Sequence, residues 1–137
     1  MLALWTALFE EDGAPTTGSW SEDAGTWFTE FVPRAHVTTL PVIEVAGRIV
    51  ATAVGSLAIG VPNAWCPRGR TARLENVYTR RSHRRRGFGT MLVLDVVSWA
   101  RRIEADRVDL STTPLGRRIY EKAGFVATSA PRMKLVL

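Results

Sequence analysis

The sequence predicts an α/β (α+β) fold in which a central mixed, mostly antiparallel sheet is flanked by about four helices. Apolar stripes at helical spacing occupy the first 33 residues. From Val37 the period changes, and the segments that follow, residues 40–45 and 48–57, are rich in β-branched residues. Later segments alternate between helical and strand periodicity. The predicted order is therefore helix, helix, three strands, helix, strand, helix, strand, with the helices packed on the sheet. At 137 residues, of which 46% are hydrophobic, the chain fits one domain, residues 1–137.

Two short helices are predicted within residues 1–36. The first spans Leu2 to Glu11 and is stopped by Asp12-Gly13 and Pro15. Ser21 resembles the N-cap of the second helix, which ends before Pro33. Its apolar stripe consists of Trp27, Phe28 and Phe31.

Three strands are predicted next. Leu40 to Val45 and Arg48 to Leu57 form an antiparallel hairpin around Ala46-Gly47. The proline-rich stretch from Val61 to Arg70 is predicted to be a loop, and Ala72 to Thr79 is the third strand. Strict alternation in the third strand places Leu74, Asn76 and Tyr78 on one face and Arg73, Glu75, Val77 and Thr79 on the other.

The rest of the chain alternates between helices and strands. A helix is predicted from about Gly87 to Ala105, followed by a strand from Arg107 to Ser111. Thr113-Pro114 resembles the N-cap and first-turn proline of a further helix, and Gly124 is its C-cap glycine. A last strand is predicted from about Phe125 to the end, interrupted near Pro131.

Charge is distributed unevenly along the chain. The first 33 residues contain six acidic residues and no Lys or Arg, whereas the rest contains all 18 basic residues and seven acidic ones. This asymmetry indicates an anionic partner for the C-terminal part and a cationic partner for the N-terminal part. For any single charge, a solvated surface position is the alternative interpretation.

Several classes of protein are excluded. Residues 1–5 lack the basic leader of a signal peptide, and the longest uncharged stretch, Ile49 to Pro67, contains prolines that rule out a membrane span. Cys66 is the single cysteine, which excludes an intrachain disulfide and a cysteine-cluster metal site. We therefore expect a cytoplasmic protein without a metal.

An anion site is predicted just after the third strand. Arg80, Arg81, His83 and Arg84-Arg85-Arg86 precede Gly87-Phe88-Gly89-Thr90 at the start of the long helix. The first turn of a helix has unpaired N–H groups, and glycine allows an oxyanion to approach them closely. Arginines supply further donors, and so many arginines in one turn repel each other unless an anion offsets them. A dinucleotide fingerprint is excluded because Leu92 stands where its third glycine belongs.

Two separated motifs resemble those of the GNAT acyltransferase superfamily. The strand Leu74-Glu75-Asn76-Val77-Tyr78-Thr79 followed by Arg84-x-x-Gly87-x-Gly89 is similar to its acetyl-CoA signature. The segment from Val108 to Thr113 with Ile119-Tyr120-Glu121-Lys122-Ala123-Gly124-Phe125 resembles its second motif. The resemblance covers roughly Leu40 to the C-terminus, so residues 37–137 would form the sheet and coenzyme-binding core.

The resemblance implies a set of contacts with acetyl-CoA. Val77, Tyr78 and Thr79 would hydrogen-bond the pantetheine arm through their backbone, and the turn from Arg84 to Thr90 would hold the pyrophosphate. Thr113 stands where many members have an asparagine that contacts the pantetheine, and it serves equally well as a helix cap. The residues of this turn that would contact the coenzyme are Arg84, Arg85, Arg86, Gly87, Phe88, Gly89 and Thr90.

Two residues are candidates for catalysis of acyl transfer to an amine. Tyr120 matches the position of a tyrosine that family members place beside the coenzyme sulfur. A phenol has a pKa of about 10 and a thiol about 8.5, so we expect a hydrogen bond to the thiolate with proton transfer accompanying its departure. Glu75 is the candidate general base, directly or through a water, with a structural ion pair as the alternative. His36, His83 and Cys66 are weaker candidates.

The sequence is compatible with more than one acceptor and more than one function. In the family, the helices of residues 1–36 shape the acceptor pocket, and here they combine acidic residues with Trp5, Trp20, Trp27 and Phe28. We expect a small cationic amine on an apolar or aromatic body, with a protein N-terminus or lysine as the alternative acceptor. A nucleic-acid-binding module is disfavoured because only two of the 18 basic residues are Lys and no binding motif is present. A non-catalytic coenzyme A-binding regulator is the third alternative.

One feature departs from the family pattern. Members usually begin with a strand before the first helix, and here that strand is missing or lies upstream of Met1. The strand from Leu40 to Val45 would then be a sheet edge, which a second copy of the chain could cover as a homodimer.

Overall fold

The computed structural model describes residues 1–15 and 18–137. Helices α1 (Leu2–Glu11) and α2 (Trp20–Phe31) come first, followed by strands β1 (Thr38–Thr39), β2 (Val42–Val45), β3 (Arg48–Ile59) and β4 (Arg70–Thr79). The 3-10 turn η1 (Arg81–His83), helix α3 (Phe88–Arg102), strand β5 (Arg107–Asp109) and helix α4 (Arg117–Lys122) complete the order.

The strands form one mixed sheet with β3 and β4 at its centre. Strands β1 and β2 both pair antiparallel with β3, β3 pairs antiparallel with β4, and β4 pairs parallel with β5. The predicted first strand is thus divided at Leu40-Pro41, and its two pieces contact different stretches of β3. Ala46 and Gly47 have φ values of 50° and 76°, which close the predicted hairpin between β2 and β3. The predicted mixed, mostly antiparallel sheet with four helices is confirmed.

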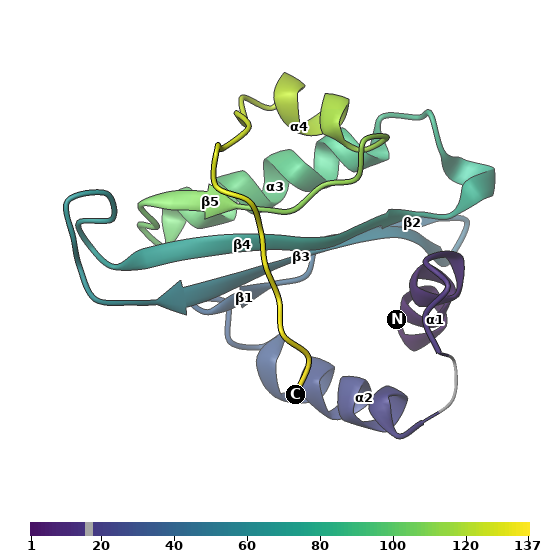
Figure 1. Ribbon diagram of the computed structural model, residues 1–137. Helices are drawn as coiled ribbons and strands as arrows, with labels where there is room; N and C mark the ends of the chain where they lie inside the picture. Colours follow the sequence, from purple (N-terminus) through teal and green to yellow (C-terminus); the bar gives the residue numbers. More distant parts are fainter. Residues whose placement is uncertain (16–17) are drawn as a thin grey trace.

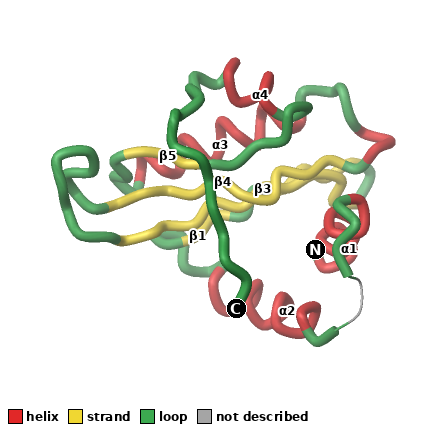
Figure 2. The backbone as a smooth tube through the Cα atoms, viewed as in Figure 1, coloured by secondary structure: helices red, strands yellow, loops and turns green. Residues whose placement is uncertain are grey.

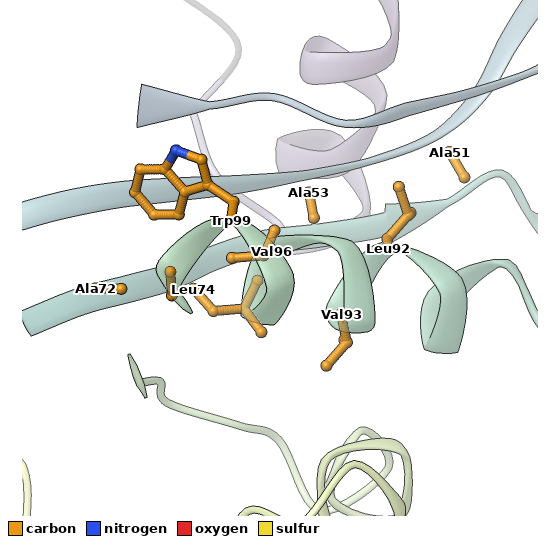
Figure 3. Packing of buried hydrophobic residues seen from close by; sticks show 9 residues of the cluster. Ala51, Ala53, Ala72, Leu74, Leu92, Val93, Val96 and Trp99 are labelled. Carbon is orange, nitrogen blue, oxygen red and sulfur yellow. The ribbon is translucent and has the colours of Figure 1, made fainter. Parts of the chain in front are cut away.

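Helices cover both faces of the sheet (Figure 1). Helices α3 and α4 lie on one face, and α1 and α2 lie on the other. The main core is between α3 and the strands, where Val96 and Trp99 face the short side chains of β3 and β4 (Figure 3). A Cβ on Gly55 would come within 2.9 Å of Val96 Cγ1, so this glycine allows α3 to lie close to β3.

A smaller core on the opposite face attaches α1 to the sheet. Leu4 and Leu8 of α1 are buried against Tyr78 of β4, with Ile49 at the margin. Helix α2 buries none of its residues fully. The N-terminal layer is therefore joined to the sheet mainly through α1.

The prediction of strict alternation in β4 is wrong beyond Glu75. Asn76 has a φ of 52°, and the pairing with β3 shifts register between Thr52 and Val54, which marks a β-bulge. The extra residue reverses the alternation. Val77 therefore packs against the α3 core, whereas Tyr78 packs against α1 on the other face.

The predicted C-terminal strand is also wrong. No residue from 125 to 137 is in a strand, and residues 126–137 are exposed. In Figure 2 this segment is loop along its whole length, and in Figure 1 it runs from α4 across the view of the strands towards α2. Pro131 has no backbone N–H, and β5 stops at Asp109, so this segment has only a short edge on which to pair.

Helix boundaries differ from the predicted ones by a few residues. Helix α3 ends at Arg102, and α4 begins at Arg117 after a turn over residues 114–116. The side chain of Thr113 accepts a hydrogen bond from the Gly116 N–H at 3.3 Å, so it caps this turn in place of the helix itself. Gly124 has a φ of 95° and follows the last turn of α4, as predicted for a C-cap glycine.

Candidate active site

The turn before α3 presents a row of backbone amides without acceptors. Helix α3 has Gly87 at its N-cap, with a φ of 79° and no side-chain cap. Among the described residues, none of the N–H groups from Arg85 to Thr90 donates a backbone hydrogen bond, and the first to do so is that of Met91, to the Gly87 oxygen at 3.1 Å. Arg85 and Gly87 both adopt the left-handed conformation, which helps successive N–H groups to converge on an anion. The turn therefore has the geometry of an oxyanion site.

Part of the positive charge in this turn is balanced within the chain. Glu11, the last residue of α1, accepts a hydrogen bond from Arg84 Nη2 at 2.5 Å, and its other oxygen lies 3.5 Å from Arg81 Nε. Arg84 Nε also donates to the Thr79 carbonyl oxygen at 2.8 Å. The prediction that all these arginines need an external anion is therefore too broad, because Glu11 pairs with Arg81 and Arg84. Arg85 and Arg86 form no ion pair among the described residues.

Glu11 also receives the hydroxyl of Tyr78. The Tyr78 Oη donates to Glu11 Oε1 at 2.7 Å. Burial alone would raise the pKa of Glu11, but the hydrogen bonds from Tyr78 and Arg84 outweigh it and hold that pKa below its usual value. The pKa of Tyr78 is raised by burial and by its carboxylate acceptor. Together these contacts attach the end of α1 to β4 and to the turn before α3.

The central strand has an open edge next to this turn. Parallel pairing between β4 and β5 is limited to residues 71–73 and 107–109, so from Leu74 onward no described strand pairs with β4 on that side. The Arg80 N–H donates to the Val50 oxygen at 2.8 Å, so alternation turns the peptide groups of Val77 and Thr79 away from β3. The Thr79 carbonyl already accepts from Arg84 Nε, and the other groups face the gap in which an extended ligand could add hydrogen bonds.

Tyr120 lies beside the open end of β5. It is half-buried on α4, and its ring makes an edge-on contact with Phe125 at 6.0 Å between centroids. A Cβ on Gly116 would lie 3.4 Å from Tyr120 Cε2, so a glycine there leaves room for the ring. Burial raises the pKa of Tyr120, and its hydroxyl makes no hydrogen bond in the described part of the chain. The phenol is therefore a protonated, unused donor.

Tyr120 and Glu75 line two hollows that share several wall residues. A hollow of about 630 Å³ is lined by Tyr120 and by residues of β5, α4 and the C-terminal segment. A second hollow, of about 480 Å³, is lined by Glu75 and Asn76. Both hollows include Asp109, Leu110, Ser111 and Arg132 in their walls. The structure thus places the two predicted catalytic residues on neighbouring depressions that share one wall.

The aromatic residues of the N-terminal helices form a separate hollow of about 680 Å³. Its walls come from α1, α2 and the segment between them, and Asp23 is the one charged residue among the described lining. The Trp20 indole N–H is buried there without a hydrogen-bond partner among the described residues. The hollow is lined by Trp5, Phe9, Ala14, Pro15, Trp20, Asp23, Ala24 and Trp27.

The weaker candidates lie elsewhere. His83 Nδ1 is 2.8 Å from the Ser82 hydroxyl, and His36 is exposed before β1. Cys66 is buried, and its thiol donates to Asp106 Oδ2 at 3.1 Å, where it helps to hold the loop between β3 and β4. That carboxylate also accepts the N–H groups of Arg68 and Arg70, so these contacts are structural.

Sequence reasoning missed Glu11, Asp109 and Arg132 as site residues. Glu11 is 73 positions from Arg84, and no local pattern predicts that contact. Asp109 and Arg132 come together through the path of the C-terminal segment, which was expected to be a strand. The available signal was the spacing of the apolar residues Val108 and Leu110, which in a strand leaves Asp109 on the opposite side of β5.

The fold and this site define an acyltransferase. A model of the acetyltransferase (GNAT) family matches residues 5–125, and the chain therefore belongs to that family. Acetyl-CoA is the co-substrate that this membership indicates, as the sequence motifs predicted. Comparison with curated protein sequences gives no match.

Solved structures share the fold at low sequence identity. An acetyltransferase of Clostridium acetobutylicum with acetyl-CoA has a TM-score of 0.82 and 21% identity, covering 98% of this chain and 89% of that one. Glucosamine-6-phosphate N-acetyltransferase of Arabidopsis thaliana has a TM-score of 0.76 and 20% identity, covering 95% and 87%. AAC(6')-Iy with a CoA-containing bisubstrate analogue has a TM-score of 0.73 and 19% identity, covering 99% and 91%. At these identities the likeness shows the fold.

Two negative findings concern the described residues. No helix within residues 1–15 and 18–137 is long and apolar enough to cross a membrane. In the same ranges, no cluster of His, Cys, Asp and Glu side chains has the arrangement of a metal site.

Proposed function

We propose that the protein transfers an acetyl group from acetyl-CoA to the amine of a small molecule that is cationic in solution. The attack is direct, within a ternary complex of enzyme, acetyl-CoA and amine. The observation that carries the proposal is the row of acceptor-free amides from Arg85 to Thr90 beside the open edge of β4, in a chain of the GNAT family.

The coenzyme would be held by the turn and by the strand edge. The amides of residues 85–90 would bind the pyrophosphate, supported by the side chains of Arg85 and Arg86. The peptide groups of Val77 and Thr79 would hydrogen-bond the pantetheine arm. This arrangement leads the arm from the helix start towards the gap between β4 and β5, where the hollows of Tyr120 and Glu75 adjoin.

The reaction needs three proton transfers. The ammonium loses one proton to Glu75, directly or through a water, and the neutral amine attacks the thioester carbonyl carbon. The C–N bond forms, the C–S bond breaks, and the amine nitrogen releases its second proton to solvent. The departing thiolate accepts a hydrogen bond and then a proton from Tyr120, which is re-protonated from solvent. The products are an acetamide and coenzyme A thiol.

The acidic N-terminal helices support a cationic acceptor. The first 33 residues contain six carboxylates and no Lys or Arg, so their field attracts an ammonium group. The aromatic hollow between α1 and α2 could hold an apolar or aromatic body of the same molecule, with Asp23 at its wall.

A screen of amines tests this proposal. Purified protein with acetyl-CoA is mixed with primary amines, peptide N-termini and uncharged alcohols, and free thiol is measured. We expect thiol release with small protonated amines. Turnover restricted to peptides would support the alternative of a protein acetyltransferase, and turnover of alcohols alone would contradict the proposed function.

A further inference from the structure

The hollow that contains Glu75 has a charge pattern that bears on the identity of the acceptor. It has a volume of about 480 Å³, enough for a small metabolite-sized molecule. Its charged lining residues are two arginines and two carboxylates, namely Arg73, Arg132, Glu75 and Asp109. A pocket meant for a purely cationic amine would not need the arginines.

Strand β4 contributes an arginine and a carboxylate to this hollow. Arg73 and Glu75 flank Leu74, which is buried in the α3 core, so both project from the opposite face of the sheet. In the described part of the chain, neither side chain forms an ion pair, and neither donates nor accepts a side-chain hydrogen bond. Both charges are therefore available to a ligand.

The opposite wall comes from β5 and the C-terminal segment. Arg132 Nη1 donates to the Ser111 hydroxyl at 2.8 Å, which fixes its guanidinium at the wall that this hollow shares with that of Tyr120. Its other donors have no partner among the described residues. Asp109, in contrast, is already 3.2 Å from Arg107 Nε and is thereby partly neutralised.

Two unpaired guanidinium groups around one hollow repel each other, and an anion removes that repulsion. A guanidinium binds a carboxylate or a phosphate through paired, planar hydrogen bonds. Glu75 favours a positive group on the ligand, because its unpaired carboxylate attracts an ammonium group. A ligand with both groups satisfies all three side chains at once.

We infer that the acceptor is a small amine that also carries an anionic group, a carboxylate or a phosphate. Arg73 and Arg132 bind the anion, and the amine lies at Glu75. This inference rests on the proposed acetyl transfer to a protonated amine and changes one part of it, because a molecule that also carries an anion has no net positive charge. It also gives the C-terminal segment a role, since that segment brings Arg132 to the acceptor.

Matched pairs of acceptors test the inference. The assay measures kcat/KM for α-amino acids against their carboxamides, and for glucosamine 6-phosphate against glucosamine. We expect the anionic member of at least one pair to be preferred by roughly tenfold or more, as removing a charged arginine contact predicts. A preference within the amino acid pairs would indicate a carboxylate on the acceptor, and a preference within the glucosamine pair would indicate a phosphate.

Variants connect the preference to the two arginines. Arg73→Gln and Arg132→Gln should each raise KM for the preferred acceptor about tenfold or more, with kcat and acetyl-CoA affinity within about twofold of wild type. Arg102→Gln, on the exposed end of α3 away from the hollow, is the matched control and should change none of these values.

The possible failures are distinguishable. Equal rates within every pair, preference for the neutral member, or no turnover of any of these amines by protein that binds acetyl-CoA would overturn the inference. The inference would also be overturned if the preference for the anionic acceptor were unchanged in both arginine variants. Protein that does not bind acetyl-CoA at all would instead remove the proposed function.

Discussion

At the scale of single residues, Tyr120 has the properties of a proton donor to a leaving thiolate. It is half-buried on α4, and burial raises its pKa, so the phenol stays protonated at neutral pH. We expect Tyr120→Phe to lower kcat by on the order of tenfold to a hundredfold, because a general acid contributes at least that much. Acetyl-CoA affinity should change by less than about threefold, since the ring and its contact with Phe125 are kept. Stopped-flow thiol release and calorimetry give the two values, and an unchanged kcat would remove the assignment.

Glu75 is the second residue whose role can be tested directly. In the proposed mechanism Glu75 accepts a proton from the acceptor, so its replacement should alter the pH dependence of kcat/KM. Glu75→Gln keeps the shape of the side chain but cannot accept the proton. We expect kcat/KM to fall by about a hundredfold or more and the lower limb of the pH profile to disappear. A profile of unaltered shape would show that a water molecule alone accepts the proton.

At the scale of elements, Glu11 joins α1 to the turn before α3. The Glu11 side chain is 23% exposed, and its carboxylate contacts Arg81, Arg84 and Tyr78. Because the pKa of Glu11 is lowered in the folded state, its stabilisation is present above the unfolded pKa of about 4.5 and is lost as pH falls through the lower folded value.

We expect Glu11→Gln to lower the free energy of unfolding by about 1 to 2 kcal/mol at pH 7, and by much less well below pH 4. Urea unfolding at several pH values measures this difference. Glu10→Gln is the matched control, because Glu10 is exposed and forms no ion pair among the described residues. A difference that is the same at pH 7 and pH 3 would contradict an ionic attachment of α1.

The loop between β3 and β4 depends on Asp106 in a similar way. Burial would raise the pKa of Asp106, but the Cys66 thiol and the backbone N–H groups of Arg70 and Arg68 donate to it and hold that pKa below its usual value. This stabilisation is therefore present above about pH 3.8 and is lost at lower pH. Asp106→Asn should lower the melting temperature at neutral pH. In acid, the difference in melting temperature between the variant and the wild type should be smaller. An unchanged melting temperature at pH 7 would show that the loop is held by other contacts.

The elements were largely predictable from local patterns, and the exceptions have physical causes. Helical periodicity predicted α3, and β-branched residues with a turn at Ala46-Gly47 predicted the β2–β3 hairpin. The bulge at Asn76 could not be predicted, because asparagine in a left-handed conformation has no distinctive neighbours in the sequence. The C-terminal segment has β-forming residues, but a strand requires a neighbouring edge, which depends on tertiary structure.

The candidate site was predictable in part. Local sequence predicts the amides of the turn, since a helix start that follows glycine and arginine has the same chemistry in any fold. The attachment of Arg84 to Glu11 and the arrival of Arg132 beside Glu75 depend on contacts between distant segments. These long-range contacts account for what the sequence did not predict in the acceptor region.

At the scale of the whole molecule, the charge asymmetry of the sequence has a counterpart in the arrangement of the helices. The acidic N-terminal helices lie on one face of the sheet, and α3, which begins at the basic turn, lies on the other (Figure 1). The anionic coenzyme and the ammonium group of the acceptor would thus be attracted to different sides of the gap between β4 and β5.

The most direct test of this account compares coenzyme A with pantetheine in calorimetric titrations of the purified protein. Pantetheine lacks the diphosphate that the amides of residues 85–90 would bind. We expect saturable binding of coenzyme A and at least about a hundredfold weaker binding of pantetheine, since several charge-assisted hydrogen bonds are lost. Equal affinities, or no saturation with coenzyme A, would contradict a phosphate-binding turn at the start of α3.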